Sequence, residues 1–163
     1  MLKKFAIAAP LAFLALGSSM AFAAGEARQS ISLIAHVPTN GFYVVPTDAD
    51  LVDKDQDMSF LPNTGKMKEV NGFFDVRNID GSVHASLEAA PKLISGANSI
   101  DLQVMFNNKE LTLTPQMVVG ESESNVNYRA PLKISAKGSS FAPGDYTGAV
   151  TMTFDAVPPV ITP

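Results

Sequence analysis

The sequence predicts an all-β sandwich, and three observations support this fold class. Apolar and polar residues alternate with a period of two in several short segments, as they do in strands with one buried face. Clusters of Gly, Pro, Asn and Asp separate these segments, as turns separate antiparallel strands. No stretch combines an apolar period of 3.6 with helix caps. Short strands joined by turns are typical of two sheets packed face to face.

The first 23 residues have the pattern of a secretory signal peptide. Residues 3–4 are lysines, residues 5–16 are mostly apolar, and residues 21–23 (AFA) form a small-x-small cleavage site. The apolar run is too short to predict a stable membrane span. We expect cleavage between Ala23 and Ala24, which leaves 163 − 23 = 140 residues, a usual length for one domain.

Charge and composition exclude several classes of function. The chain carries 12 basic and 16 acidic residues, a formal net charge of −4, and loss of Lys3 and Lys4 with the signal peptide would make it −6. An acidic chain without basic clusters repels phosphate backbones, so we expect no nucleic-acid partner. The chain contains no cysteine, which removes disulfides, thiol catalysis and thiolate metal sites.

Residues 28–38 (RQSISLIAHVP) follow the predicted cleavage site and have the pattern of a strand. Pro38 ends this segment, because it brings no N–H group to a β-ladder. The residues that alternate on its apolar face are Ile31, Leu33, Ala35 and Val37. The pattern leaves two possibilities open: the strand pairs within its own sandwich, or it joins the sheet of a neighbouring molecule.

The predicted strands of the body follow in order. They are residues 42–45, 58–61, 70–78, 82–88, 100–106, 109–114, 131–137 and 146–155. Turn signals at residues 80–81 (DG) and 107–108 (NN) each predict a hairpin between the flanking strands. The residues expected to face the core include Val83, Ala85, Leu87, Ile100, Leu102, Val104, Phe106, Leu111, Leu113, Leu132, Ile134 and Ala136.

The last predicted strand has the clearest alternation. Its apolar side holds Tyr146, Gly148, Val150, Met152 and Phe154. This pattern predicts a half-buried strand that faces a sheet interior, with Tyr146 as a core residue. Beyond it, residues 157–163 (VPPVITP) form a proline-broken, extended tail.

Two polar stretches are predicted as loops. Residues 48–57 contain five aspartates, and the alternate aspartates of residues 53–57 have the spacing that begins an EF-hand calcium loop. However, Met58 stands where that loop needs Gly, and Thr64 where it needs Glu. We therefore interpret this stretch as a charged loop and predict no metal site. Residues 121–127 (ESESNVN) predict the second polar loop.

Motifs for catalysis are missing. The sequence contains neither G-x-S-x-G nor S-x-x-K, and His36 and His84 stand in no catalytic or metal-binding motif. Glu121 and Glu123 lie in a solvated setting that would not raise a carboxyl pKa for acid catalysis. We predict a protein that is not an enzyme and has no cofactor.

Segments at both ends of the predicted mature chain carry a resemblance to a known family. The ISLIAHVP segment near its start and the PGDYTGAVTMTF segment near its end, together with the absence of cysteine, resemble the major pilins of the CS1-type (class 5, alpha-fimbrial) chaperone–usher pili of Gram-negative bacteria. The VPPVITP tail departs from the pattern of that family.

The resemblance implies an immunoglobulin-like β-sandwich that lacks its final strand and is completed by the N-terminal strand of a neighbouring subunit. It divides the chain into a signal peptide (residues 1–23), a donor-strand extension (residues 24–38) and a pilin domain (residues 39–163). The implied donor residues are Ile31, Leu33, Ala35 and Val37, and the implied acceptor-groove residues are Val150, Met152 and Phe154.

The resemblance also implies partners and a location. The partners are identical subunits in a head-to-tail polymer, a periplasmic chaperone, an outer-membrane usher and a tip adhesin. The subunit would be exported through the periplasm to a fimbrium on the cell surface and would support cell adhesion. The alternative hypothesis is a monomeric secreted or periplasmic binding module with a closed β-sandwich.

Overall fold

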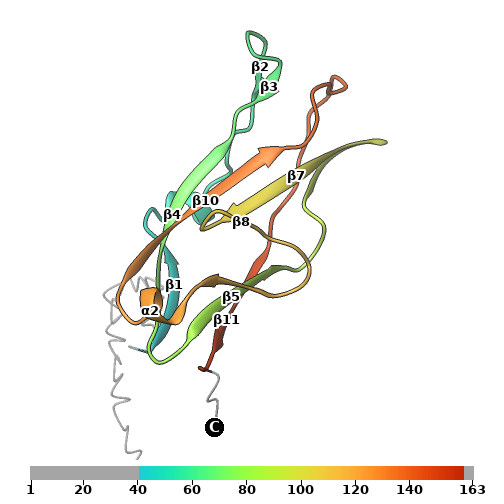
Figure 1. Cartoon of the computed structure of the whole chain (residues 1–163). Helices are drawn as coiled ribbons and strands as arrows, with labels where there is room; N and C mark the ends of the chain where they lie inside the picture. Colours follow the sequence, from blue (N-terminus) through green and yellow to red (C-terminus); the bar gives the residue numbers. More distant parts are fainter. Residues whose placement is uncertain (1–40, 160–163) are drawn as a thin grey trace, which may run out of the picture. The chain divides into compact units, whose positions relative to one another are not determined.

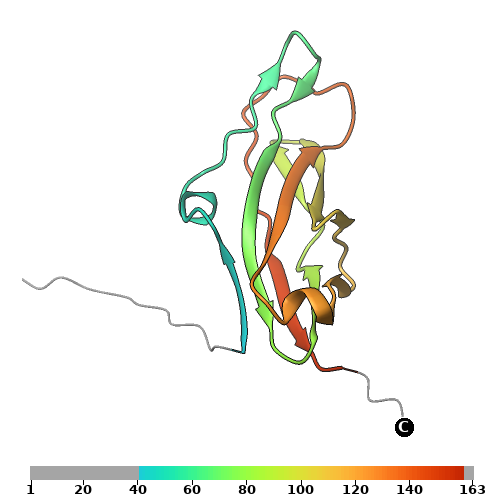
Figure 2. The same cartoon turned by 60° about the vertical axis from the view of Figure 1, so that its left-hand side comes forward.

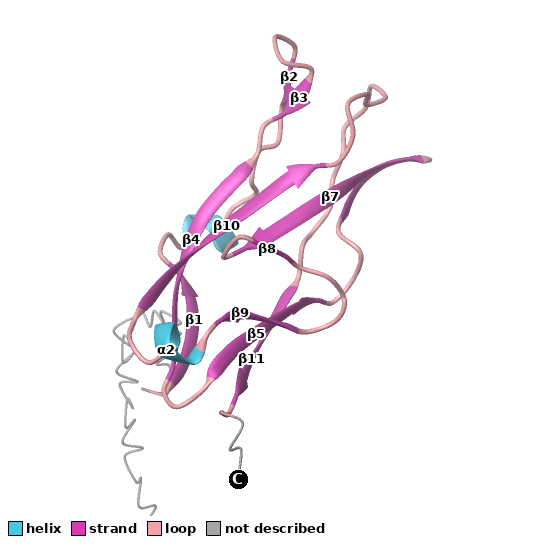
Figure 3. Cartoon of the chain, in the orientation of Figure 1, coloured by secondary structure: helices cyan, strands magenta, loops and turns pink. Residues whose placement is uncertain are grey.

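The computed structural model describes residues 41–159, which form two packed antiparallel sheets, a two-stranded hairpin and two short helices (Figures 1 and 3). The elements are β1 (Phe42–Pro46), α1 (Asp50–Asp53), β2 (Phe60–Leu61), β3 (Lys66–Met67), β4 (Val70–Asn78), β5 (Ser82–Leu87), β6 (Lys92–Ser95), β7 (Asn98–Phe106), β8 (Lys109–Glu110), β9 (Gln116–Val119), α2 (Glu121–Ser124), β10 (Tyr128–Ala136) and β11 (Met152–Val157). No helix in this part of the chain is long and apolar enough to cross a membrane.

The larger sheet has the strand order β1-β4-β10-β7-β6, and β8 pairs with β7. Its central strands alternate as the sequence predicts, because every second side chain of a strand points to the same face. In β7, Ile100, Leu102, Val104 and Phe106 are all buried, which confirms the predicted core face. The smaller sheet has the order β11-β5-β9, and the predicted core residues of β5 are buried in it.

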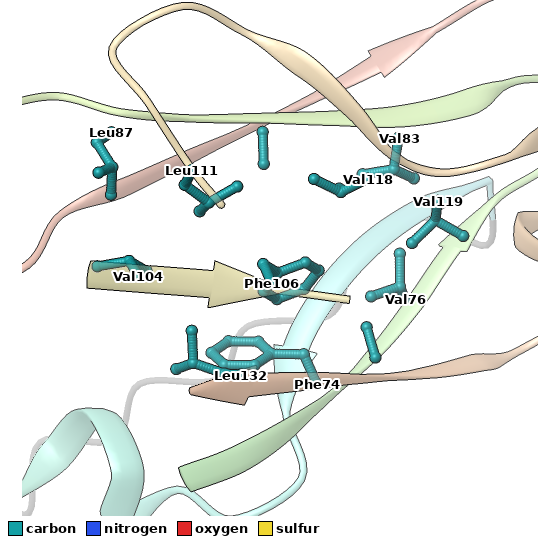
Figure 4. Packing of buried hydrophobic residues seen from close by; sticks show 12 residues of the cluster. Phe74, Val76, Val83, Leu87, Val104, Phe106, Leu111, Val118, Val119 and Leu132 are labelled. Carbon is teal, nitrogen blue, oxygen red and sulfur yellow. The ribbon is translucent and has the colours of Figure 1, made fainter. Parts of the chain in front are cut away.

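The core lies between the two sheets (Figure 4). Val76 from β4 and Val83 from β5 are both fully buried, although only three residues separate the two strands. Three phenylalanine rings meet in this core: Phe106 lies 5.6 Å from Phe74 and 5.0 Å from Phe154, measured between ring centroids. Aromatic pairs at such separations add to the free energy that apolar burial supplies.

The turn at residues 80–81 was expected to close a hairpin, and this prediction is wrong. Asp80 has the positive φ (60°) that such a turn requires, but β4 and β5 belong to different sheets. The Asn78 side chain donates a hydrogen bond to the Ser82 carbonyl at 2.8 Å and closes the turn locally. An Asp-Gly signal fixes a local reversal and does not determine whether the flanking strands pair.

The hairpin predicted at residues 107–108 is confirmed, but its second strand is shorter than expected. Asn107 and Asn108 have positive φ values of 48° and 61°, and β8 ends at Glu110. The chain then crosses to the smaller sheet, where the backbone N–H of Leu87 donates to the Thr112 carbonyl at 2.7 Å. Leu111 is buried, whereas Leu113 is 60% exposed, so the prediction that Leu113 faces the core is wrong.

The last predicted strand, residues 146–155, is divided in two. Thr147 exchanges two backbone hydrogen bonds with Ile94 of β6, at 2.8 and 3.1 Å, before the chain enters β11. Gly148 makes this crossing possible, because a Cβ atom there would lie against the Lys92 carbonyl and 3.0 Å from Leu93 Cδ2. Tyr146 is half-buried, and its hydroxyl donates to the Ala142 carbonyl at 2.9 Å, so it fastens a loop instead of filling the core.

Three short strands and both short helices were not predicted. β3, β6 and β9 span two to four residues, too few for a period of two to stand out. α1 and α2 lie within the two predicted polar loops, and each is a single turn of four residues. Ser124 in α2 is fully buried, and its hydroxyl donates to the Gly81 carbonyl at 2.6 Å, which connects α2 to the β4–β5 turn.

Candidate functional site: the uncovered edge of the sandwich

The candidate site comprises two strands that end their sheets, β11 in the smaller sheet and β1 in the larger one. β11 pairs with β5 on one side, from Met152 opposite Leu87 to Val157 opposite Ser82, and it has no partner strand on the other side within residues 41–159. β1 is likewise the end strand of the larger sheet and pairs only with β4 in this part of the chain. An edge strand presents unpaired N–H and C=O groups that favour the addition of another strand.

The apolar side chains along this edge are half-buried, although they pack against the core. Five of them come from the two edge strands and the segment that leads into β11: Phe42, Val44, Val150, Met152 and Phe154. Their burial is incomplete on the chain itself, so a covering strand would remove further apolar surface from water at roughly 25 cal/mol per Å².

Phe154 shows how the edge connects to the interior. Its ring lies 5.0 Å from Phe106, which is fully buried, and 6.2 Å from Phe74, which is 4% exposed. Phe154 itself is half-buried, so one layer of side chain separates the buried core rings from solvent.

The sequence-predicted site residues divide into two groups. Val150, Met152 and Phe154 are half-buried and pack against the core; Met152 and Phe154 lie on β11, and Val150 precedes it. Ile31, Leu33, Ala35 and Val37, and the predicted cleavage site at Ala23 and Ala24, lie outside the described residues.

Sequence reasoning did not assign Phe42 and Val44 to the site. Both residues are half-buried in β1 and pack against the core. The signal that could have found them is their spacing of two, which places both on one face of a strand.

The charged residues of the described part form exposed pairs elsewhere. Hydrogen bonds from Lys137 and then Gln103 lower the pKa of Glu110, and the Ser59 hydroxyl lowers the pKa of Asp57. The Asp75 carboxylate raises the pKa of Arg129 above its ordinary value through a paired hydrogen bond at 2.9 and 3.2 Å. None of these groups belongs to the apolar edge.

The aspartate stretch is organised by local contacts. Asp50 forms a salt bridge with Lys54 at 2.7 Å, and Asp57 accepts hydrogen bonds from the Ser59 hydroxyl at 2.6 Å. Among residues 41–159 there is no group of three His, Asp or Glu side chains that could hold a metal ion. His84 is half-buried on β5 and stands opposite Asp155 in the β5–β11 ladder.

Comparison with known proteins assigns the chain to a family. The model of a family described as CS1 type fimbrial major subunit matches residues 27–155, and the chain belongs to this family. It is therefore a structural subunit of a bacterial fimbrium, exported to the cell surface, and its family is not an enzymatic one. The match begins before the described residues and includes Ile31 to Val37.

Solved structures support the same fold. The chain is similar to the CooA pilin subunit from enterotoxigenic Escherichia coli, with a TM-score of 0.52 and 21% identity over 69% of this chain and 86% of that chain. It is also similar to a chain of the chaperone–tip adhesin complex of CFA/I fimbriae biogenesis, with a TM-score of 0.51 and 11% identity over 74% of this chain and 42% of that chain. A search of curated proteins gave no match. The predicted immunoglobulin-like β-sandwich and the resemblance to CS1-type major pilins are confirmed.

Proposed function

We propose that this subunit polymerises by strand donation, with the N-terminal arm of one copy (residues 24–38) pairing with the free edge of β11 in the next copy. The observation that carries this proposal is that β11 has no partner strand on one side within residues 41–159, beside the half-buried Val150, Met152 and Phe154. The family suggests which molecule donates the strand, because the neighbours of a major subunit in a fimbrium are copies of itself.

The arm carries apolar side chains that could cover this edge. Ile31, Leu33, Ala35 and Val37 repeat with the period of two that one face of a strand requires. Full burial of the three larger aliphatic side chains would contribute about 5 to 9 kcal/mol. This is comparable with the whole stability of a small domain, about 5 to 15 kcal/mol, so a subunit without a donated strand would be close to unfolding.

Strand donation would also produce a filament. A donor surface and an acceptor surface on different parts of one chain make a heterologous contact, which generates an open polymer when the rotation between copies does not close a ring. We propose further that the signal peptide ends at residue 23 and that residues 39–163 form the pilin domain.

A free β11 edge must be covered before polymerisation, since exposed edges promote aggregation. We propose that a periplasmic chaperone covers it first, that an outer-membrane usher exchanges the chaperone for the arm of another subunit, and that a tip adhesin joins the assembly. A chaperone–tip adhesin complex is described for the similar CFA/I protein. The proposed role of this subunit is to build the shaft that supports adhesion.

The test uses the mature chain, residues 24–163, and a self-complemented variant. In this variant, residues 24–38 are moved behind Pro163 through a flexible linker, so that the arm can reach the edge of its own domain. We expect the mature chain to polymerise or aggregate without a chaperone and the self-complemented variant to be a stable monomer. A matched control carries Leu33→Asp in the relocated arm and is expected to be unstable.

The alternative of a monomeric binding module makes the opposite prediction. If the unmodified mature chain unfolds reversibly as a monomer in sedimentation and thermal unfolding experiments, strand donation is not needed and the proposal fails.

A further inference from the structure

One end of the sandwich carries exposed aromatic and aliphatic side chains. There, β2 and β3 extend beyond the larger sheet, with the loop of residues 137–146 beside them (Figures 1 and 2). Phe60 is 51% exposed and Leu61 is 40% exposed. The Phe60 ring packs edge-on against Phe141 from the loop, with 6.3 Å between centroids. We call Phe60, Leu61 and Phe141 the tip surface.

The contact between Phe60 and Phe141 gives the tip surface a fixed form. A two-stranded hairpin is only marginally stable by itself in water. Here β2 and β3 pair over two residues each, and the aromatic contact joins them to the neighbouring loop. An apolar surface held in place by its own packing loses little conformational entropy when it binds.

The opposite end carries a second exposed apolar surface. Ile79 follows β4 and is 40% exposed, and Val126 follows α2 and is 63% exposed. The two segments meet, because the backbone N–H of Asp80 donates to the Asn125 side chain at 3.0 Å. We call Ile79 and Val126 the root surface, because the described part of the chain begins beside it, at Gly41.

The backbone connects the root surface to the proposed donor arm. The N–H of Ile79 donates to the carbonyl of Gly41 at 2.7 Å, and Gly41 lies three residues after Pro38, where the arm ends. The four residue steps from Val37 to Gly41 span at most about 14 Å. A subunit that binds the arm up to Val37 must therefore come close to the root surface of the donor.

The direction of β11 determines which end of the acceptor, the subunit that binds the arm, lies beside the root surface of the donor. The end of β11 lies at the root end of its own domain, because a Cβ atom on Gly81 would be 3.2 Å from the Val157 carbonyl carbon. All the ladders of the described part are antiparallel. An arm that pairs antiparallel with β11 enters at Val157 and leaves at Met152, toward the tip end of the acceptor.

We propose that the tip surface of one subunit packs on the root surface of the subunit whose arm it binds. The occupant of the tip surface is thus a second copy of this chain, and each joint of the filament has two contacts: the donated strand and this apolar cap. Lys66 stands opposite Leu61 in the hairpin and Asp80 follows Ile79, so charges of opposite sign flank the two surfaces. This inference rests on the proposed strand donation.

The absence of cysteine from the chain permits a direct test by disulfide linkage in assembled fimbriae. Phe60→Cys and Ile79→Cys are introduced together, the fimbriae are oxidised, and the subunits are separated by boiling in detergent without reductant. We expect a ladder of covalent multimers, which reductant removes. The pair Leu61→Cys and Val126→Cys provides a second link, should the first pair reduce assembly.

Two controls define the result. The pair Leu113→Cys and Ile79→Cys uses an equally exposed residue of the β8–β9 connection and is expected to give monomers. Dimers from Ile79→Cys alone would mean that two root surfaces meet, which overturns the proposal. Monomers from both tip–root pairs in intact filaments would overturn it as well.

Failure of this inference can be distinguished from failure of strand donation. Leu33→Asp in the arm tests strand donation and leaves both apolar surfaces unchanged. If Leu33→Asp abolishes filaments but the tip–root pairs do not link in native-length filaments, strand donation stands and the cap is wrong. If filaments persist with Leu33→Asp, strand donation itself is wrong, and a tip–root ladder in those filaments would show that the cap alone joins the subunits.

Discussion

The ring of Phe154, on the edge strand β11, lies 5.0 Å from the ring of Phe106, which is fully buried on β7 in the opposite sheet. This pair joins the two sheets at the edge where no further strand covers the core within residues 41–159. The packing of the domain and the proposed binding of a donated strand therefore depend on the same side chain.

Replacing Phe154 by Ala should lower both the stability of the domain and its affinity for the arm. Complete removal of a buried Phe side chain costs about 3 to 5 kcal/mol, and we expect a loss in this range in the self-complemented variant because its relocated arm would cover Phe154. The measurement is the free energy of unfolding of the self-complemented variant in urea. Thr151→Ala, at an exposed position just before β11, is the control and should change stability by less than about 0.5 kcal/mol. Equal effects of both changes would contradict the assignment of Phe154 to the core.

Leu33→Asp should separate the donor function from the acceptor function. A carboxylate in an apolar site costs several kcal/mol unless it is paired or protonated, so the variant should not donate its arm. Its own β11 edge is unchanged, so it should still bind the chaperone. Pull-down with the chaperone and a polymerisation assay with native subunits measure the two activities. Equal loss of both would indicate that Leu33 belongs to the core of its own domain.

Gly148→Ala should disturb the crossing between the sheets. The new methyl group would be forced against the Lys92 carbonyl and Leu93, and overpacking of this kind costs about 1 to 3 kcal/mol. Gly41→Ala is the matched control, because nothing lies within 4 Å of a Cβ atom at that position. Thermal unfolding of the self-complemented variant compares the two. A Gly148→Ala variant as stable as Gly41→Ala would show that the close approach to β6 is not required.

The ion pair between Glu110 and Lys137 predicts a small effect of pH on stability. Lys137 donates to Glu110 at 2.9 Å and lowers the pKa of this carboxyl, so the pair stabilises the folded state above the unfolded-state pKa and stops doing so as pH falls through the folded-state value. We expect Glu110→Gln to lower the unfolding midpoint at pH 7. The difference from native should shrink as the pH falls below the ordinary glutamate pKa, about 4.3, and vanish below the lowered folded-state pKa. Both groups are exposed, so added salt should reduce the effect. A difference that grows at low pH would contradict this cause.

The sequence predicted the long strands well, because each carries enough residues for alternation to appear. β4 was predicted with its observed bounds, and the buried face of β7 was predicted residue by residue. Apart from the β7–β8 hairpin, the sequence did not show which strands pair. Asp80 marks a reversal whether the chain remains in one sheet or changes to the other, and Gly148 shows its role only when β6 lies against it.

The candidate site was predicted in part for a similar reason. Alternation placed Val150, Met152 and Phe154 on one side of a strand, and in the structure all three are half-buried and pack against the core. Alternation alone did not show that β1 would add Phe42 and Val44, because that depends on the packing of the two sheets. The same limit applies to the arm: its pattern indicates a strand, and only the family indicates a neighbouring subunit.

The most direct test of strand donation is the path of residues 31–37 in an assembled filament, determined by electron cryo-microscopy. We predict that these residues run antiparallel along β11 of the adjacent subunit, with Leu33 and Val37 directed toward the side of Met152 and Phe154. An arm that pairs with a strand of its own domain would contradict strand donation and would favour a closed, self-sufficient sandwich.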